Sequence, residues 1–514
     1  MIRPLPPKAR QTARRLSRLG MAAALAMLPV AVHMPANARA RGAQPAAPTP
    51  ARDVRPNIIV ILADDLGYGD VSSYGSRIRT PNIDALARAG TRYTAAYATA
   101  PICSPSRAGL LSGRSQQRFG FHFNITGRGD QIGMPGSETT IAEVARSAGY
   151  TTAMVGKWHV GNGGDRYPLD QGFNSFYGFV DGAARYFPAD ARDVVAADSG
   201  SDSLVTRERF PIIDGRTVVH PGGNLTDVFT DRAVDVIRQN RDQPFFLYLA
   251  YNAPHTPLQA SAEDVAPFAH IASPYERVYR AMVSKLDNGV GRVMAALQQE
   301  NLTRQTIVIF LSDNGCPNYD MGACSNAPFN GYKAFPLEGG TRVPFILSAP
   351  GRLRGGRTEE LMVSTLDLMP TIANAIGAPT PTAAEGRNLL NRRSLTRDRA
   401  LFWRMGPNHW VRQGRWKLVV MNRSATVQAL GEVIGRAMTH DVDINVPAIG
   451  QWVALFDLQR DPGETRNIAT RHPREVARLQ QLFSEWDRSN QAPAFGSRRE
   501  YRTEIDGQRV QLIF

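Results

Sequence analysis

The segment Asn57-Ile-Ile-Val-Ile-Leu62 is followed at once by Ala63-Asp64-Asp65-Leu66-Gly67, and together the two stretches indicate the fold class. A short run of isoleucine, valine and leucine without alternating polar positions indicates a strand buried on both faces, as in parallel sheets covered by helices. Polar residues directly after such a strand lie at its carboxyl end, where α/β sheets bind their ligands. The segment therefore predicts a central parallel strand and one part of a ligand site.

Apolar runs and helical patterns continue to alternate along the chain. Further strands are expected at residues 152–155, 244–251, 306–311 and 344–347. Helices are expected between them, at residues 82–89, 140–148, 226–240, 275–299 and 366–376. The pattern predicts an α/β fold with a large, mostly parallel sheet sandwiched by helices.

The character of the chain changes after about residue 390. Short aromatic segments separated by turn signals lie at residues 400–404, 409–412, 416–420 and 452–457, and a helical pattern follows at 473–489. We therefore expect a catalytic domain over residues 55–390 and a smaller C-terminal domain over residues 391–514, built from an antiparallel sheet plus a helix. Residues 422–449, between two of its strands, are expected to form a long loop or insertion.

The composition is that of a globular protein, with 43% hydrophobic and 21% charged residues in a chain of 514. It excludes disordered, fibrous and membrane-embedded proteins, and the length favours at least two domains. The formal net charge of +14 attracts polyanions, although an arginine-rich composition alone would produce the same excess. No dense basic run is present, so we expect no nucleic-acid partner.

The N-terminus has the pattern of an export signal. Basic residues between Arg10 and Arg18 precede an apolar stretch at residues 21–30, and small residues at 36–40 offer cleavage points. The apolar stretch is too short to span a membrane comfortably, so we expect no stable membrane insertion. Residues 1–40 are expected to be a signal peptide and residues 41–54 a leader or linker, which predicts export to a bacterial periplasm or the medium.

The chain has three cysteines, Cys103, Cys316 and Cys324, too few for a disulfide-built scaffold of this size. Cys316 and Cys324 lie close together in a loop rich in glycine, proline and asparagine, and we expect them to pair in an oxidising compartment. Cys103 is then the odd thiol, and an odd thiol in an exported protein requires an explanation.

Polar residues follow four of the predicted strands, and parallel strands bring their carboxyl ends to one edge of the sheet. The residues that these ends would supply are Asp64, Asp65, Lys157, His159, Asn252, His255, Asp313 and Asn314. The oxygen-only set of Asp64, Asp65, Asp313 and Asn314 favours a hard cation such as Ca²⁺ or Mg²⁺ over Zn²⁺. An Asp-Asp pair alone is often a turn or a helix cap, and the matching Asp-Asn at a second strand favours metal binding.

A helix is expected to start at Cys103-Ser-Pro-Ser-Arg107, with Ser104 as its cap and Pro105 in its first turn. Cys103 would lie at the positive end of the helix dipole, with Arg107 on the same face. Such a position activates a nucleophile or binds an anion. The alternative is that Cys103 is a small buried apolar residue.

These segments resemble the sulfatase family. Cys103-Ser-Pro-Ser-Arg107 matches the C-x-P-x-R signature of sulfatases, and Gly149-Tyr-Thr-Thr-Ala-Met-Val-Gly-Lys-Trp-His159 matches their second signature. Further landmarks similar to those of the family lie at residues 57–69, 80–84, 338–344, 455–458 and 461–467. The resemblance runs in order from about residue 55 to about residue 490, and it implies a formylglycine-dependent, arylsulfatase-like enzyme of the alkaline phosphatase superfamily.

The resemblance implies that a formylglycine-generating maturation enzyme oxidises Cys103 to formylglycine. One hydroxyl of the hydrated aldehyde would attack sulfur, and loss of a proton from the second would expel sulfate. The family's metal ligands map onto Asp64, Asp65, Asp313 and Asn314, with residue 103 completing the shell around one divalent cation. We expect Ca²⁺, with Mg²⁺ as the alternative.

Further roles follow from the resemblance, residue by residue. Arg107 would stabilise the hydrated aldehyde, and Lys157 and Lys333 would neutralise charge on the sulfate. His159 would take the proton of the hydrated aldehyde, and His255 would protonate the leaving alcohol. Trp158 is expected to be a packing residue. Lys333 lies beyond a loop that does not align with the family pattern, where a lone lysine is usually a solvated surface residue.

Two other functions remain open from the sequence. One is a phosphatase or phosphonate monoester hydrolase of the same superfamily, and the other is a non-catalytic protein that binds sulfated glycans. The expected substrate is a sulfated polysaccharide, ahead of small aryl sulfates, because of the basic charge and a large middle insertion. The loops expected to set this choice are 118–135, 178–223 and 316–330.

Overall fold

The computed structural model describes residues 55–125, 132–197, 206, 209–317, 322–423, 450–496, 500–505 and 508–513. The expected signal peptide and linker, and most of the loop expected at residues 422–449, lie outside the described residues. Among the helices described, none is long and apolar enough to cross a membrane.

A ten-stranded mixed sheet forms the centre of the molecule, in the order β13-β2-β12-β11-β1-β9-β4-β5-β7-β8. Its five central strands run parallel. These are β11 (Thr306–Ser312), β1 (Asn57–Ala63), β9 (Phe245–Ala250), β4 (Thr151–Lys157) and β5 (Ser175–Phe179). The outer strands are β13 (Arg357–Glu359), β2 (Thr91–Tyr93), β12 (Phe345–Ser348), β7 (Ile212–Asp214) and β8 (Thr217–Val219). β12 pairs antiparallel with β11, so the strand expected at residues 344–347 exists but does not extend the parallel part.

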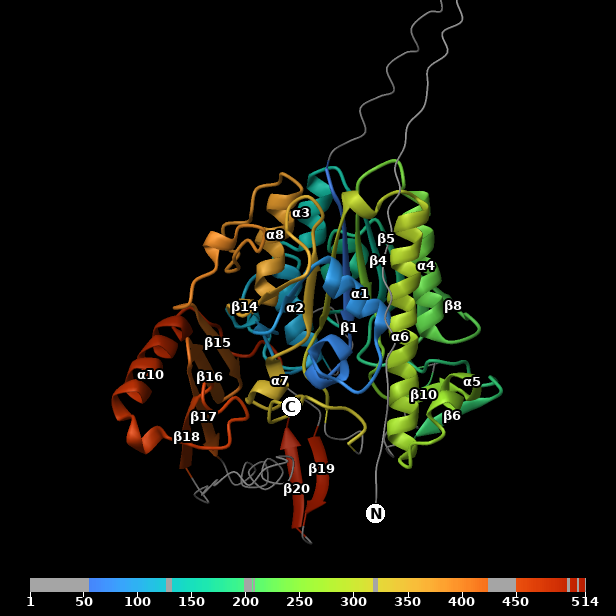
Figure 1. Ribbon diagram of the computed structural model, residues 1–514. Helices are drawn as coiled ribbons and strands as arrows, with labels where there is room; N and C mark the ends of the chain where they lie inside the picture. Colours follow the sequence, from blue (N-terminus) through green and yellow to red (C-terminus); the bar gives the residue numbers. More distant parts are fainter. Residues whose placement is uncertain are drawn as a thin grey trace, which may run out of the picture. The chain divides into compact units, whose positions relative to one another are not determined.

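Helices cover both faces of this sheet (Figure 1). One layer contains α1 (Pro81–Ala89), α4 (Leu225–Gln239) and α6 (Pro274–Gln299), and the other contains α2 (Cys103–Ser112), α3 (Ile141–Ser147) and α8 (Leu368–Ala375). Alternate residues of β1 serve the two cores, because Ile59 and Ile61 pack with the first layer while Ile58 and Val60 pack with the second. The buried-strand prediction for β1 is therefore confirmed.

A separate four-stranded antiparallel sheet forms the C-terminal part. Its strands are β15 (Ala400–Met405), β16 (Asn408–Gln413), β17 (Trp416–Arg423) and β18 (Gly450–Asp457), and α10 (Pro473–Asp487) follows. Leu479 and Phe483 of α10 pack on one face of the sheet, and the indole of Trp403 on the other face donates a hydrogen bond to Ala98 O at 2.8 Å. The predicted fold class is confirmed for both parts.

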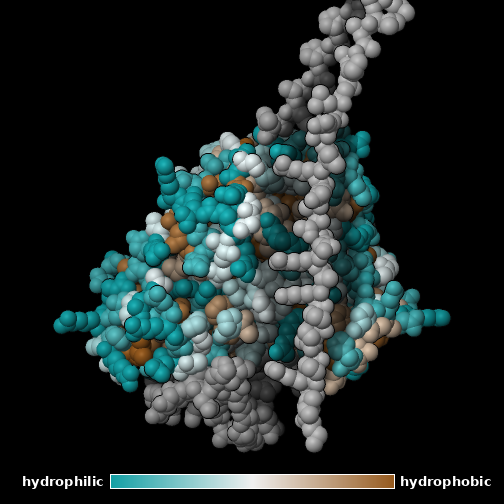
Figure 2. Space-filling view, viewed as in Figure 1, coloured by the Kyte–Doolittle hydropathy of each residue, from teal (hydrophilic) through white to brown (hydrophobic). Residues whose placement is uncertain are grey.

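The remaining strands and α-helices are short. They are the strands β3 (Ala96–Tyr97), β6 (Val194–Ala197), β10 (Leu258–Ser261) and β14 (Val363–Ser364), the helices α5 (Ala262–Val265) and α7 (Glu338–Thr341), and the hairpin β19 (Glu500–Ile505) with β20 (Gln508–Ile513). Hydrophilic side chains cover most of the visible described surface, with only small apolar areas (Figure 2). Among the described residues, Val218 is the one large apolar side chain that is strongly exposed.

Candidate active site

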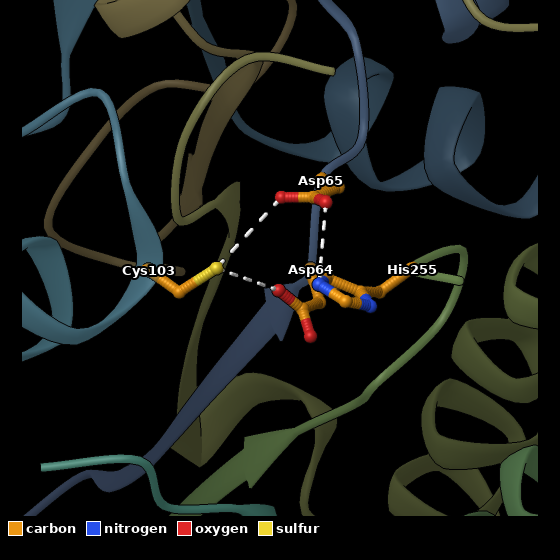
Figure 3. A group of neighbouring side chains, drawn as sticks. All are labelled: Asp64, Asp65, Cys103 and His255. Atoms are coloured by element: carbon orange, nitrogen blue, oxygen red, sulfur yellow. Dashed lines mark hydrogen bonds and ion pairs between the residues drawn. The ribbon is translucent and has the colours of Figure 1, made fainter. Parts of the chain in front are cut away.

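The carboxyl ends of the central strands bring the predicted polar residues together. β1 is flanked by β11 and β9, so the residues after Ala63 lie beside those after Ser312 and Ala250. Potential ligand atoms of Asp64, Asp65, Cys103 and His255 all lie within 4.8 Å of one another (Figure 3). Cys103 points at the two carboxylates from the start of a helix, and His255 approaches from a loop (Figure 3). These residues define a buried polar site at this edge of the sheet.

Asp313 and Asn314, from the end of β11, complete the oxygen-rich part of the site. Asp313 Oδ1 accepts a hydrogen bond from the backbone N–H of Asp65 at 3.2 Å, and Asn314 Nδ2 donates to Asp65 Oδ1 at 2.6 Å. Asn314 Oδ1 is buried and has no hydrogen-bond partner among the described residues. A buried, unpaired amide oxygen beside three carboxylates is the donor set that a hard cation requires, so the residues present fit the predicted metal.

The carboxylates of the site differ in acidity. Burial, together with the charge of Asp64, raises the pKa of Asp313 to about 6. Burial alone would also raise the pKa of Asp65, but Lys333, His255 and Lys157 outweigh burial and hold it below its usual range. The mutual repulsion of these carboxylates is what a bound divalent cation would relieve.

Cys103 is the first residue of α2, so its side chain lies at the positive end of the helix dipole, as predicted. Its Sγ atom is 3.6 Å from Asp64 Oδ1 and 3.9 Å from Asp65 Oδ1. Burial, opposed by Lys157 and Lys333, raises the pKa of the thiol to about 12. An unmodified Cys103 therefore stays protonated at neutral pH and is a weak nucleophile.

The prediction that Ser104 caps this helix is wrong. The cap position lies two residues earlier, at Ile102, which makes no side-chain cap hydrogen bond. Asn124 Oδ1 instead accepts from the Ser104 N–H at 3.0 Å. Asn124 is 20 residues away in the sequence, so no local pattern pointed to it.

Arg107 and Lys157 form a buried layer of positive charge beneath the carboxylates. Arg107 Nε is 2.9 Å from Asp313 Oδ2, and its Nη1 donates to Lys157 O at 2.7 Å. Lys157 Nζ is 2.6 Å from Asp64 Oδ2. All four side chains are fully buried, so these pairs are strong and fix the orientation of Asp64 and Asp313.

Lys333 also belongs to the site, although the sequence around it could not be aligned with the family pattern. Its Nζ atom is 2.7 Å from Asp65 Oδ2, and its side chain is 9% exposed. The reading of Lys333 as a solvated surface residue is therefore excluded. The loop that carries it is held at Cys316, whose carbonyl accepts from the Lys333 N–H at 2.9 Å.

Cys316 and Cys324 form a disulfide, as predicted. Replacing both with alanine is expected to lower the stability of this loop by about 2–3 kcal/mol, because a short closed loop loses its covalent constraint. Lys333 should also be held less firmly in the site, since its N–H is hydrogen-bonded to Cys316 O. Hydrogen exchange at residues 322–335 and kcat/KM would measure both effects. Alkylation of two free thiols at these positions in the exported, non-reduced protein would contradict the pairing.

The two histidines occupy different places. His255 Nε2 is 3.5 Å from Asp65 Oδ2, and its Nδ1 lies 2.6 Å from Thr256 O. Burial, and then the charge of Lys333, lowers the pKa of His255 to about 3. His159 is buried after β4 with φ +58°, and Gly182 packs so closely that a Cβ there would be 2.8 Å from its Nε2. The structure thus places His255 in the cluster, while His159 lies against the loop that contains Gly182.

Two further positions support the site. Ser106, inside the C-x-P-x-R signature, donates from its hydroxyl to Asp313 O at 2.5 Å. Tyr186 OH is 2.6 Å from Asn252 O and 2.9 Å from His255 O, and so holds the loop that carries His255. Trp158 is fully buried in the core, so the prediction that it is a packing residue is confirmed.

Comparisons with known proteins agree with this geometry. The sulfatase family model matches residues 56–378. N-acetylgalactosamine-6-sulfatase from Canis lupus familiaris is 32% identical over 444 residues, covering 80% of this chain and 81% of that protein. Human arylsulfatase A is 32% identical over 463 residues, covering 83% of this chain and 87% of that protein.

A solved structure, that of Ps i-CgsB in complex with k-i-k-neocarrahexaose, superposes with a TM-score of 0.74 and is 31% identical. It covers 86% of this chain and 94% of that chain. The family model spans the chain from β1 to α8. The chain therefore belongs to the sulfatase family, whose members hydrolyse sulfate esters.

Proposed function

We propose that the protein removes sulfate from a sulfated carbohydrate, with residue 103 converted to formylglycine and with one divalent cation in the site. The observation that carries the proposal is the convergence of Cys103, at the start of α2, with a buried set of oxygen ligands and several basic side chains. Asp64, Asp65, Asp313 and Asn314 would hold the cation. We expect Ca²⁺, because the donors are carboxylate and amide oxygens.

The bound cation would supply positive charge next to residue 103 and the sulfate. The hydrated aldehyde of formylglycine would supply one hydroxyl that accepts the sulfuryl group and a second whose loss of a proton releases sulfate. The chain's own residues prepare this chemistry. Lys157 and Lys333, which form ion pairs with Asp64 and Asp65, would neutralise sulfate oxygens, and Arg107 would hold the start of the helix against Asp313.

His255 is proposed as the acid that protonates the leaving alcohol. Its Nδ1 faces Thr256 O, which favours a proton on Nδ1 and leaves Nε2 directed at the site. Burial disfavours the doubly protonated ring in the free enzyme. An anionic sulfate bound beside the ring would favour that form, because an opposite charge stabilises the imidazolium.

Leaving-group dependence should separate the two histidines. His255→Ala is expected to lower kcat on sugar sulfates by about 100-fold or more but on 4-nitrophenyl sulfate by less than about 10-fold, since an activated phenol needs little protonation. His159→Ala should slow both substrates alike and leave sulfate bound to residue 103, which mass spectrometry of the peptide would detect. Equal losses from both variants on every leaving group would count against these roles.

The carbohydrate substrate is supported by two comparisons. One relative is named N-acetylgalactosamine-6-sulfatase, and Ps i-CgsB was solved in complex with k-i-k-neocarrahexaose. Screening matured enzyme against sulfated glycans would test this choice. Paired rates on sulfate and phosphate esters would test the class, because a phosphatase or phosphonate hydrolase of the same superfamily would prefer the second.

We also propose that the protein acts after export, in a periplasm or the medium, with residues 1–40 removed as a signal peptide. The disulfide between Cys316 and Cys324 supports an oxidising compartment. The catalytic and C-terminal domains are proposed to meet near residue 390, ahead of β15. N-terminal sequencing of the exported protein would test the cleavage.

A further inference from the structure

Lys333 lies on a loop, residues 330–338, that is closed at its base. Gly339 N–H donates to Asn330 O at 2.7 Å, so the two ends of the loop meet. Between them, Ala334 N–H donates to Pro101 O at 2.7 Å, which seats the loop over the segment that leads to Cys103. A lysine has a long flexible stem, so the position of its ammonium group depends on how firmly this backbone is held.

A turn of the C-terminal part holds both ends of this loop. The side-chain amide of Asn330 donates to Gly463 O. The next residue, Glu464, accepts the Glu338 N–H on its Oε2 at 2.6 Å. Gly463 and Glu464, which follow β18, thus accept hydrogen bonds from the first and last residues of the Lys333 loop.

Glu464 is itself held by a buried charge network. Its Oε1 is 2.8 Å from Lys417 Nζ on β17, and Lys417 is 3.1 Å from Glu338 Oε1. Glu338 Oε2 also accepts from Arg412 of β16 at 3.0 Å and from Tyr97 at 2.5 Å. Glu464 is fully buried with φ +52°, a left-handed conformation that non-glycine residues keep only where the surroundings enforce it.

The short helix α7, which begins at Glu338, also contacts the loop that carries the proposed metal ligand Asn314. Gly315, directly after Asn314, donates from its N–H to Gly340 O at 3.0 Å. A Cβ at Gly315 would lie 1.7 Å from Gly339 O, so the two backbones are in contact. A shift of Glu338 and α7 would therefore displace both Lys333 and Asn314.

We propose that Glu464, with Gly463, is a positioning residue that holds Lys333 against the sulfate site, so the C-terminal part contributes to turnover without contacting the substrate. The proposal rests on the proposed function, in which Lys333 neutralises sulfate oxygens. The path runs from Glu464 through the Glu338 N–H and the closed loop to Lys333.

A double-mutant cycle in the full-length, matured enzyme tests this path. Glu464→Ala and Asn330→Ala are each expected to lower kcat/KM on 4-nitrophenyl sulfate by about 10- to 100-fold, because a displaced catalytic group loses its alignment. In a Lys333→Ala background each should cost at least about fivefold less than in the wild type, because the main group they position is gone and only the contact of α7 with the Asn314 loop remains. Glu464→Gln should retain more activity than Glu464→Ala, since one oxygen can still accept the Glu338 N–H.

A matched control separates positioning from general stability. Arg399→Met breaks another buried ion pair, in which Arg399 Nη1 is 2.6 Å from Asp367 Oδ2. Arg399 lies just before β15 in the sequence. The substitution should lower the Tm but change kcat/KM per folded molecule by less than about twofold. If Glu464→Ala fails to fold, Asn330→Ala carries the same cycle.

The possible outcomes are distinct. Equal losses from Glu464→Ala, or from Asn330→Ala in its place, with and without Lys333 would overturn the positioning role while leaving the proposed function intact. A matured wild-type enzyme that hydrolyses no sulfate ester would overturn the proposed function itself.

Discussion

Turnover of sulfate esters is expected to fall by about four orders of magnitude or more when Cys103 is replaced by alanine, while the fold is retained. The change deletes one buried atom at the start of α2 and keeps a good helix former there. It also removes the atom that approaches Asp64 and Asp65, so the proposed nucleophile is lost from the cluster. Initial rates on 4-nitrophenyl sulfate, with circular dichroism and Tm as controls for folding, measure the two effects separately.

Serine at position 103 is the matched comparison. Cys103→Ser offers one hydroxyl, so it should accept a sulfuryl group once and then stall, because its ester has no second hydroxyl to expel sulfate. The peptide should become heavier by one sulfuryl group. The wild-type peptide, in contrast, should be lighter than unmodified cysteine predicts and should react with carbonyl reagents. A fully active preparation with wholly unmodified Cys103 would refute the proposed nucleophile.

The main fold was predictable because it depends on local patterns. β1, β9 and β11 are short, nearly continuous apolar runs, and β4 contains a shorter one at residues 153–155. Runs of this length, bounded by turn signals, favour a buried strand. The direction of β12 was not predictable in the same way. An antiparallel strand of four buried residues has the same apolar pattern as a parallel one, and only its long-range pairing with β11 and β2 distinguishes them.

The part of the candidate site that lies at the ends of the central strands was predictable. Asp64 and Asp313 follow buried strands, so the topology of the sheet brings them together. Residues that act over long sequence distances were harder to identify. Asn124 accepts a hydrogen bond from the Ser104 N–H in the first turn of α2, 20 residues earlier in the sequence. Glu464 accepts one from the Glu338 N–H, 126 residues earlier. Neither has a local signature, because such contacts arise only from the packed chain.

Removal of divalent cations is expected to abolish turnover by the matured enzyme, and Ca²⁺ should restore it better than Zn²⁺. Asp64, Asp65, Asp313 and Asn314 offer only oxygen, and burial, together with the charge of Asp64, raises the pKa of Asp313, so a bound cation would stabilise its ionised form. Activity after chelation and re-addition of Ca²⁺, Mg²⁺ or Zn²⁺, together with the shift in Tm on binding, would identify the ion. Full activity in metal-stripped enzyme would contradict the prediction.

Maturation should itself change which metal the site prefers. In the unmodified chain, Cys103 Sγ and a nitrogen of His255 lie within 4.8 Å of the Asp64 and Asp65 oxygens, which is a donor set that suits Zn²⁺. The proposed conversion of Cys103 to formylglycine would remove the sulfur and leave an oxygen-rich site. Zn²⁺ is therefore expected to stabilise the unmodified protein and Ca²⁺ the matured one. Asn314→Ala should weaken Ca²⁺ binding in the matured enzyme, because it removes the unpaired amide oxygen. Identical metal preferences before and after maturation would show that residue 103 is not part of the metal site.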